Sequence, residues 1–180
     1  TAQIPATVAV DAAGNPNTAS AALSRTYDAA APSVTLDSTA PDPTNSATIP
    51  VTATFSESVT GFTASDLVVT NASVSGFAGS GASYSFDLAA AGNGTVSVRV
   101  PAGSAADAAG NSNTASLELS RTYDGTKPAA AISGEADGAT NASPVAVTVT
   151  FTESVSGFAA QDLTLTNATL SSFSGSGATY

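Results

Sequence analysis

The feature that most constrains the fold of this chain is a long internal repeat. Residues 107–128, DAAGNSNTASLELSRTYDGTKP, recur as residues 11–32, DAAGNPNTASAALSRTYDAAAP. The same separation of 96 positions relates Tyr27 to Tyr123, Glu57 to Glu153, and Tyr84 to Tyr180. A period of this length predicts one small structural unit that recurs in tandem along the chain. We therefore expect copies of one small domain rather than a single large domain.

The period also predicts how the domains divide the chain. Residues 1–28 correspond to the C-terminal part of a preceding repeat, residues 32–127 to one complete repeat, and residues 128–180 to the N-terminal part of a following repeat. The first residues match the middle of a repeat and have no basic start or apolar core typical of a signal peptide. We expect the chain to begin inside a longer parent protein.

Within the complete repeat, short runs of alternating apolar and polar residues predict β-strands. Ile49, Val51, Ala53 and Phe55 alternate with smaller or polar residues, which is the period of a half-buried strand. Further short strands are expected at residues 33–37, 66–70, 73–77, 83–88, 95–100 and 117–119, separated by clusters of Gly and Asn. No stretch shows a helical stripe of useful length. The pattern predicts an all-β fold of tandem antiparallel β-sandwiches.

A domain of this size buries a limited core, so its large side chains should supply much of it. The aromatic residues of the complete repeat are Phe55, Phe62, Phe77, Tyr84, Phe86 and Tyr123. We predict that they pack in the interior of the sandwich.

The charge balance excludes several classes of function. Only 4 Lys+Arg stand against 14 Asp+Glu, a net charge of −10, which repels phosphate backbones and anionic membrane surfaces. We expect no nucleic-acid partner and no direct membrane insertion, since no apolar run is long enough to span a bilayer. The chain has no cysteine, so it has neither disulfides nor thiolate metal ligands.

The order of motifs carries a resemblance to a known family. FSESVTGFTASDLVVTNASVSGF, GSGASYSF, GNGTVSVRVPAG, DAAGNSNTAS and RTYDGTKP follow one another through the complete repeat. This series resembles the bacterial Ig-like repeats of large surface proteins and adhesins. The resemblance covers the whole chain and implies an immunoglobulin-like sandwich in an extended extracellular stalk, often with calcium at the domain junctions. It does not name a receptor.

In an immunoglobulin-like sandwich, loops from both sheets gather at the end where the chain enters. Residues with oxygen ligands lie on these loops and on the linker of residues 28–32. They are Asp28, Glu57, Asp66, Asp107, Asn111 and Asn113. Calcium binds six to eight such oxygens, from carboxylates, amides, backbone and water. We expect a calcium site at this first junction, and a half-built one at the next from Asp124, Glu153 and Asp162.

A simpler interpretation remains open for these residues. Asp and Asn in glycine-rich loops often act only as turn formers that bond their own backbone. Glutamates at positions 57 and 153 favour calcium, because a turn gains nothing from glutamate there. Outside this group, Arg25 and Arg121 are expected to pair with surface carboxylates.

The residue inventory and the repetition favour a structural function. The chain lacks His and Cys, which excludes the common catalytic triads and thiol chemistry, and it lacks a Trp that could form a sugar platform. We therefore predict a spacer or stalk repeat of an exported bacterial protein, with neighbouring repeats as its partners, rather than an enzyme. Two alternatives are a calcium-dependent lectin and a filament subunit whose incomplete end domains complement each other head to tail between chains.

Overall fold

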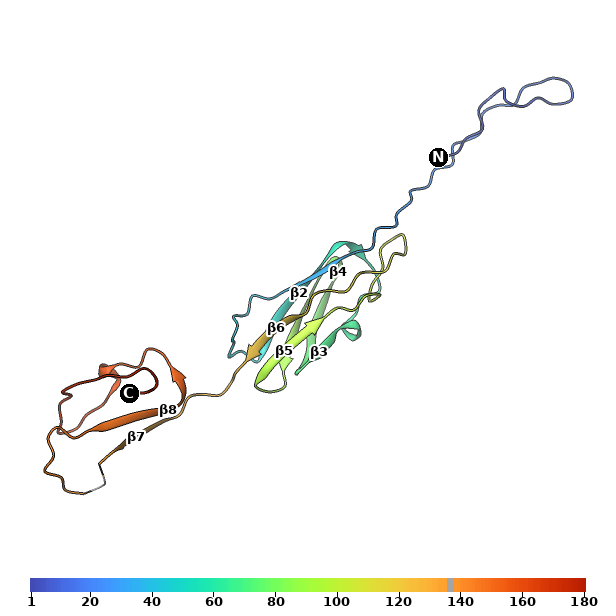
Figure 1. Cartoon of the computed structure of the whole chain (residues 1–180). Coiled ribbons are helices and arrows are strands. Elements are labelled where there is room, and N and C mark those ends of the chain that lie inside the picture. Colours follow the sequence, from blue (N-terminus) through green and yellow to red (C-terminus); the bar gives the residue numbers. More distant parts are fainter. Residues whose placement is uncertain (136–137) are drawn as a thin grey trace. The chain divides into compact units, whose positions relative to one another are not determined.

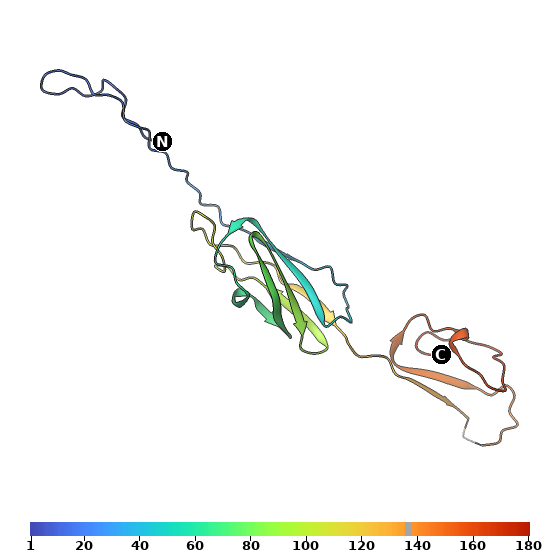
Figure 2. The same cartoon turned by 180° about the vertical axis from the view of Figure 1, so that it is seen from behind.

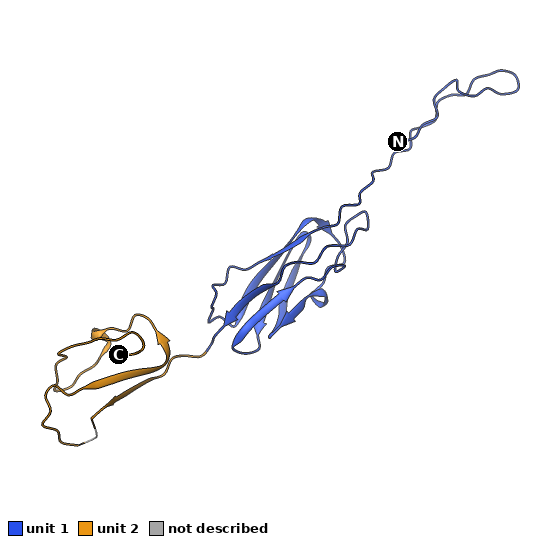
Figure 3. Ribbon diagram, in the orientation of Figure 1, with its two compact units in different colours: residues 1–125 blue, residues 126–180 orange. Residues whose placement is uncertain are grey.

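The structure describes residues 1–135 and 138–180 and divides them into two compact units, Thr1–Gly125 and Thr126–Tyr180 (Figure 3). In this computed structural model (Figure 1), the regular elements of the described residues are β-strands and two short 3-10 turns. None of the described residues forms a helix that is long and apolar enough to cross a membrane. The all-β prediction is confirmed.

The first sheet of the complete repeat is antiparallel, in the order β1-β2-β4. Its strands are β1 (Val34–Asp37), β2 (Thr48–Val59) and β4 (Ala72–Ala90). Along β2, the apolar residues predicted to face inward are buried, and the residues between them are exposed. The alternation therefore fixes which face of this sheet covers the core.

Strand β4 folds back on itself as a hairpin, and it contains both strands predicted at residues 73–77 and 83–88. The backbone of Gly79 lies so close to Ser83 and Tyr84 that an added Cβ would clash, and the Ala91 N–H donates to the Asn71 carbonyl (3.0 Å). Residues 73–77 were expected as a separate short strand but form one arm of this hairpin. Figure 2 shows the sandwich from behind. A glycine is required at position 79 because its φ of 126° is open to few other residues.

The second sheet has the order β3-β5-β6 and is also antiparallel. Its strands are β3 (Val68–Thr70), β5 (Gly94–Arg99) and β6 (Leu119–Tyr123), and the 3-10 turn η1 (Ala64–Asp66) leads into β3. Leu117 was expected in the closing strand but lies exposed before it. The two sheets enclose one core, in which Val96, Val98 and Val100 from the β5 region are fully buried.

The aromatic residues pack in this core as predicted. Phe55, Phe62, Tyr84 and Phe86 are buried, and Phe77 and Tyr123 are partly buried against the same cluster. Their rings meet mostly edge to face, for example Phe62 and Tyr84 with centroids 5.0 Å apart. Such pairs contribute about 0.5–1.5 kcal/mol each beyond their buried area.

The second unit repeats the first part of this plan. Its sheet has the order β7-β8-β9, with β7 (Ala130–Gly134), β8 (Val147–Val155) and β9 (Gly177–Thr179), and the turn η2 (Ala160–Asp162) follows β8. Residues 1–27 form no extended strand and are joined by isolated bridges, Ala2 with Leu23 and Val10 with Pro16.

Candidate metal site

Three carboxylates of the first unit come together at one end of the sandwich. Asp28 lies in the segment before β1, Glu57 near the end of β2, and Asp107 in the connection between β5 and β6. One carboxylate oxygen from each lies within 4.8 Å of the others. The sequence predicted these three residues as ligands, and the fold gathers them from positions 79 residues apart.

Asp107 is held in place by its own loop. Its Oδ1 accepts hydrogen bonds from the backbone N–H groups of Ala109 (2.9 Å) and Asn111 (2.8 Å), and its Oδ2 accepts one from the Asn111 side chain (2.8 Å). These bonds hold the pKa of Asp107 below its ordinary value of 3.8, and the bond from the Asn111 side chain contributes most. Burial acts in the opposite direction. Asp107 is therefore a fixed carboxylate at neutral pH.

Asn111 also connects the loop to the segment that enters the repeat. Its Nδ2 donates to the backbone carbonyl of Asp28 (3.3 Å), while the Thr114 N–H donates to the carbonyl of Pro32 (2.8 Å). The Asp28 carboxylate accepts from the Ala30 N–H (3.0 Å), which turns the chain toward β1. The linker before the complete repeat is thus bound to the repeat by direct hydrogen bonds.

Glu57 takes its place from the alternation of β2. Position 57 continues the inward-facing series of Ala53 and Phe55, and the pairing of β2 with β4 becomes irregular between Thr54 and Val59. Its carboxylate is therefore half-buried at the rim of the core, where a charge is costly unless it is neutralised. Glu153, its counterpart on β8, has a buried Oε1 that makes no hydrogen bond with the described residues.

Three other predicted ligands serve the local backbone. The Asp66 Oδ2 accepts from the N–H (2.8 Å) and hydroxyl (2.7 Å) of Thr63 and closes the turn η1. Asp162 accepts from the Ala159 N–H in the same way (2.9 Å). Asn113 is 2 % exposed, and its amide bonds backbone groups at Ala105, Pro101 and Thr114. The turn-former interpretation thus describes what these side chains do here.

The predicted second site was to use Asp124, Glu153 and Asp162. Asp124 lies next to the end of the first unit, where its Oδ1 accepts a hydrogen bond from the Asn93 side chain (2.7 Å). Glu153 and Asp162 belong to the second unit. This second site stays a prediction.

Sequence reasoning missed the roles of Asn93 and Arg121. Asn93 accepts from the Gly125 N–H (3.0 Å) in addition to bonding Asp124, so it holds the end of the repeat. Arg121 was expected to pair with a surface carboxylate, but its guanidinium donates to the carbonyls of Ala40 (2.9 Å) and Ser38 (3.1 Å). The available signal was that the arginine recurs at position 25.

The cluster of Asp28, Glu57 and Asp107 has the chemistry of a hard-cation site. Its donors are carboxylate oxygens, and two oxygens bound to one calcium ion at 2.3–2.6 Å are at most about 5 Å apart. Without a cation, two like charges at 4 Å repel by roughly 1–4 kcal/mol at a protein surface. A divalent ion between them would remove this repulsion and stabilise the loop and linker together.

Comparison with known proteins agrees with the fold and the repeat. Neither the curated proteins nor the solved structures gave a match to the chain. The profile of the bacterial Ig-like domain, in contrast, matches residues 28–123 and again residues 124–180. These matches cover most of the sequence and begin 96 residues apart, so the chain belongs to the bacterial Ig-like domain family and carries its domain as a structural repeat.

Proposed function

We propose that the chain is a spacer repeat from the stalk of an exported, adhesin-type bacterial surface protein, and that calcium stiffens it. The observation that carries this proposal is the group of three carboxylates within 4.8 Å of one another. Asp28 belongs to the entering linker, whereas Glu57 and Asp107 belong to the sandwich. An ion bound by all three would tie the linker to the domain and restrict the bending of the chain at this point.

The donor set favours calcium over softer or smaller cations. The chain has no His and no Cys, so its side-chain ligands are hard oxygens. Three carboxylates provide part of the six to eight ligands that calcium needs, and the Asn111 side chain and water can supply others. A site of this kind is expected to bind with a Kd of about 0.1–1 mM, as in other extracellular modules.

Repetition supports the spacer role. Bacterial Ig-like domains typically occur in exported or surface proteins, where adding repeats adds length. Polar side chains of the loops also serve the structure: Asp107 and Asn113 order a loop, and Asp66 closes a turn. We propose a non-enzymatic role on that ground, with neighbouring repeats as the direct partners.

Calorimetry in chelator and in about 5 mM calcium tests the proposed function. At the affinity given above, calcium should stabilise the complete repeat by about 1–2 kcal/mol and raise its Tm by roughly 5–15 °C. Glu57→Gln and Asp107→Asn should remove this rise. Glu118→Gln is the matched control, since Glu118 is exposed and lies outside the cluster. An absent rise, or an equal rise in Glu57→Gln, would contradict the metal assignment.

A further inference from the structure

The connection between β1 and β2 lies beside the last strand and runs parallel to it. Thr44 and Tyr123 form a parallel bridge: the Thr44 N–H donates to the Thr122 carbonyl, and the Asp124 N–H donates to the Thr44 carbonyl (both 2.9 Å). Thr44 is buried in this contact. The strand pairs of both sheets, by comparison, are antiparallel.

Side chains from both segments extend this parallel contact on the N-terminal side of the bridge. Arg121 reaches across from β6, where its Nε donates to the Ala40 carbonyl and its Nη2 to the Ser38 carbonyl. From the other segment, the Asp42 carboxylate accepts a hydrogen bond from the Thr122 N–H (2.8 Å). These bonds involve charged groups, which form shorter and stronger hydrogen bonds than neutral pairs do. Residues 38–44 and 121–124 together are called the clamp below.

The clamp joins the first and last parts of the repeat, so the relative direction of its two segments decides how it responds to tension. The chain enters the sandwich through β1 just before residue 38 and leaves it through β6 at Asp124. Tension on the two ends pulls residues 38–44 back toward β1 and pulls residues 121–124 out toward Gly125. Because the two segments are parallel, they slide past each other and their hydrogen bonds are loaded together, instead of opening one at a time from an end.

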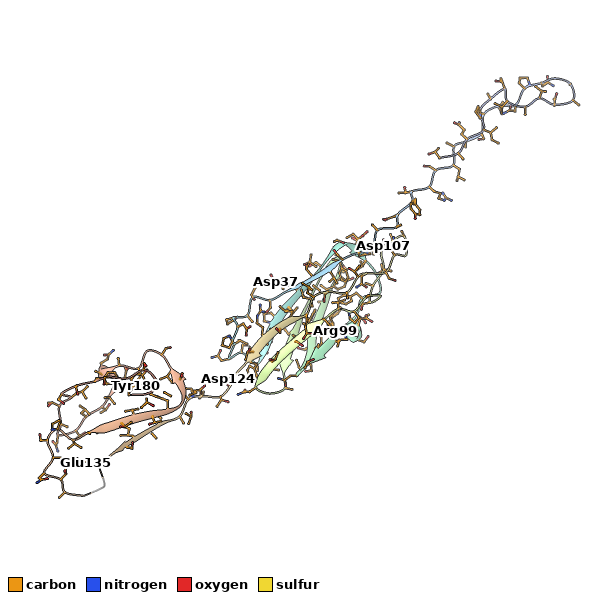
Figure 4. The ribbon with its side chains drawn as sticks, viewed as in Figure 1. Asp37, Arg99, Asp107, Asp124, Glu135 and Tyr180 are labelled. Carbon is orange, nitrogen blue, oxygen red and sulfur yellow. The ribbon has the colours of Figure 1, made fainter. Side chains whose placement is uncertain are left out.

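We propose that the complete repeat carries tension along the chain through this clamp, and that Arg121 is its main side chain. The proposal deepens the proposed stalk function and rests on it for the direction of the load. The clamp is separate from the metal site: Asp107 and Asp124 lie at opposite ends of the sandwich (Figure 4). Arg121 binds backbone carbonyls, so its own part of the clamp depends little on which side chains the loop carries.

Single-molecule unfolding of the 180-residue chain in chelator tests this inference. The chain is held by its two ends, and extension of residues 34–123 at 3.3–3.6 Å each identifies the complete repeat by a gain of roughly 250–300 Å. Arg121→Ala should raise the unfolding rate under load by about 5- to 30-fold, because it removes two charge-assisted hydrogen bonds that the load must break. Arg99→Ala is the control for charge, since Arg99 is exposed on β5 and lies outside the clamp. It should leave the rate within about twofold.

A second pulling direction separates a load-bearing role from a purely stabilising one. The chain has no cysteine, so Ser85→Cys on the exposed face of β4 provides a unique handle. Tension between the N-terminus and residue 85 leaves β6 out of the loaded path, and Arg121→Ala should then change the rate at least threefold less. Asp42→Ala, which removes one acceptor of the clamp, provides a milder variant if Arg121→Ala does not fold, and its effect should show the same dependence on direction.

Equal effects in both directions, or no effect of either variant, would overturn the clamp. Because these measurements are made in chelator, their outcome is independent of calcium. If Arg121→Ala weakens the repeat under load but calcium does not raise its Tm, the clamp is supported and the metal site is contradicted. If calcium raises the Tm but neither variant has a direction-dependent effect, the metal site is supported and the clamp is contradicted.

Discussion

The two units share one part of their core and differ in the other. The aromatic clusters of the complete repeat and of residues 126–180 have the same geometry. The ring centroids of Phe55 and Phe62 are 5.2 Å apart, as are those of Phe151 and Phe158, and Phe62–Tyr84 and Phe158–Tyr180 are both 5.0 Å. In contrast, Ile49 is 1 % exposed and its counterpart Val145 is 50 % exposed, while Val51 is 2 % and Val147 is 57 % exposed.

The difference shows which parts of the repeat build which part of the core. The rings that contact one another come from β2, β4 and the segment between them, so these contacts form without β5 and β6. The aliphatic residues at the start of β2 are buried only where Val96 and Val98 from β5 cover them. The aromatic cluster is therefore a local structure of the first part of the repeat, whereas the aliphatic core requires both sheets.

The largest effect is expected from the centre of the aromatic cluster. Phe62 contacts Phe55, Phe77 and Tyr84, so Phe62→Ala should cost the complete repeat about 3–5 kcal/mol of unfolding free energy, measured by urea denaturation. The equivalent change in the second unit tests whether its cluster forms locally. Phe158→Ala should move the ring-shifted NMR signals of Tyr180 toward their unstructured positions, just as Phe62→Ala should move those of Tyr84. Unchanged Tyr180 signals in Phe158→Ala would show that the second cluster does not form as a local structure.

The identical valines at positions 51 and 147 test the aliphatic part of the comparison. Val51→Ala removes two buried methyl groups and should cost roughly 1.5–3 kcal/mol. Val147→Ala removes the same groups from an exposed site and should change stability by at most about 0.5 kcal/mol. Both values come from urea denaturation of the full chain, and similar losses at the two positions would contradict the comparison.

A third test uses the asparagines that order the two copies of the loop. Asn113 and Asn17 make equivalent hydrogen bonds through their amides, but Asn113 is buried, whereas Asn17 is only partly so. Asn113→Ala should lower the unfolding free energy by about 1–3 kcal/mol because it leaves buried backbone groups without partners. Asn17→Ala should not change that transition by calorimetry. Loss of stability from both would mean that residues 1–27 contribute to the folded core.

The smallest expected effect is on the pH dependence of stability. Hydrogen bonds lower the pKa of both Asp107 and Asp11 below 3.8. The largest contribution comes from the side chain of Asn111 at Asp107 and from the side chain of Asn15 at Asp11. A lowered pKa in the folded state gives stability that is present above the ordinary pKa and is lost as the pH falls through the folded value. Asp107→Asn should therefore flatten the acid limb of the stability curve. NMR titration of either carboxyl at or above 3.8 would contradict this account.

The sequence predicted those features that depend on local pattern and on the repeat. The alternation of Ile49, Val51, Ala53 and Phe55 identified the inner face of β2, and the period related the two units. The same alternation puts Glu57 on the inward face, although this was recognised only in the structure. Three of the nine predicted metal ligands form the cluster.

Other features depend on contacts between distant segments and were not predictable from pattern. The hairpin within β4 was predicted only as two separate strands, residues 73–77 and 83–88, because Gly79 gives no indication of which backbone lies against it. Arg121 binds backbone carbonyls more than 80 residues away in the sequence. Every residue has a backbone carbonyl, so the sequence does not indicate which of them accepts a hydrogen bond. The sequence does not distinguish Asn113 from other asparagines in loops. Only the fold shows that both the oxygen and the nitrogen of its side-chain amide form hydrogen bonds with backbone groups.

The most direct measurement is a calcium titration of the full chain, followed by NMR through the backbone amides of its two equivalent loops. Residues 107–111 and 11–15 have the same aspartate hydrogen bonds, but among the described residues only Asp107 has partner carboxylates, from Asp28 and Glu57. We predict that the signals of residues 107–111 shift and saturate at millimolar calcium while those of residues 11–15 stay unchanged. Equal shifts in both loops, or no shift in either, would contradict a calcium site built by the complete repeat.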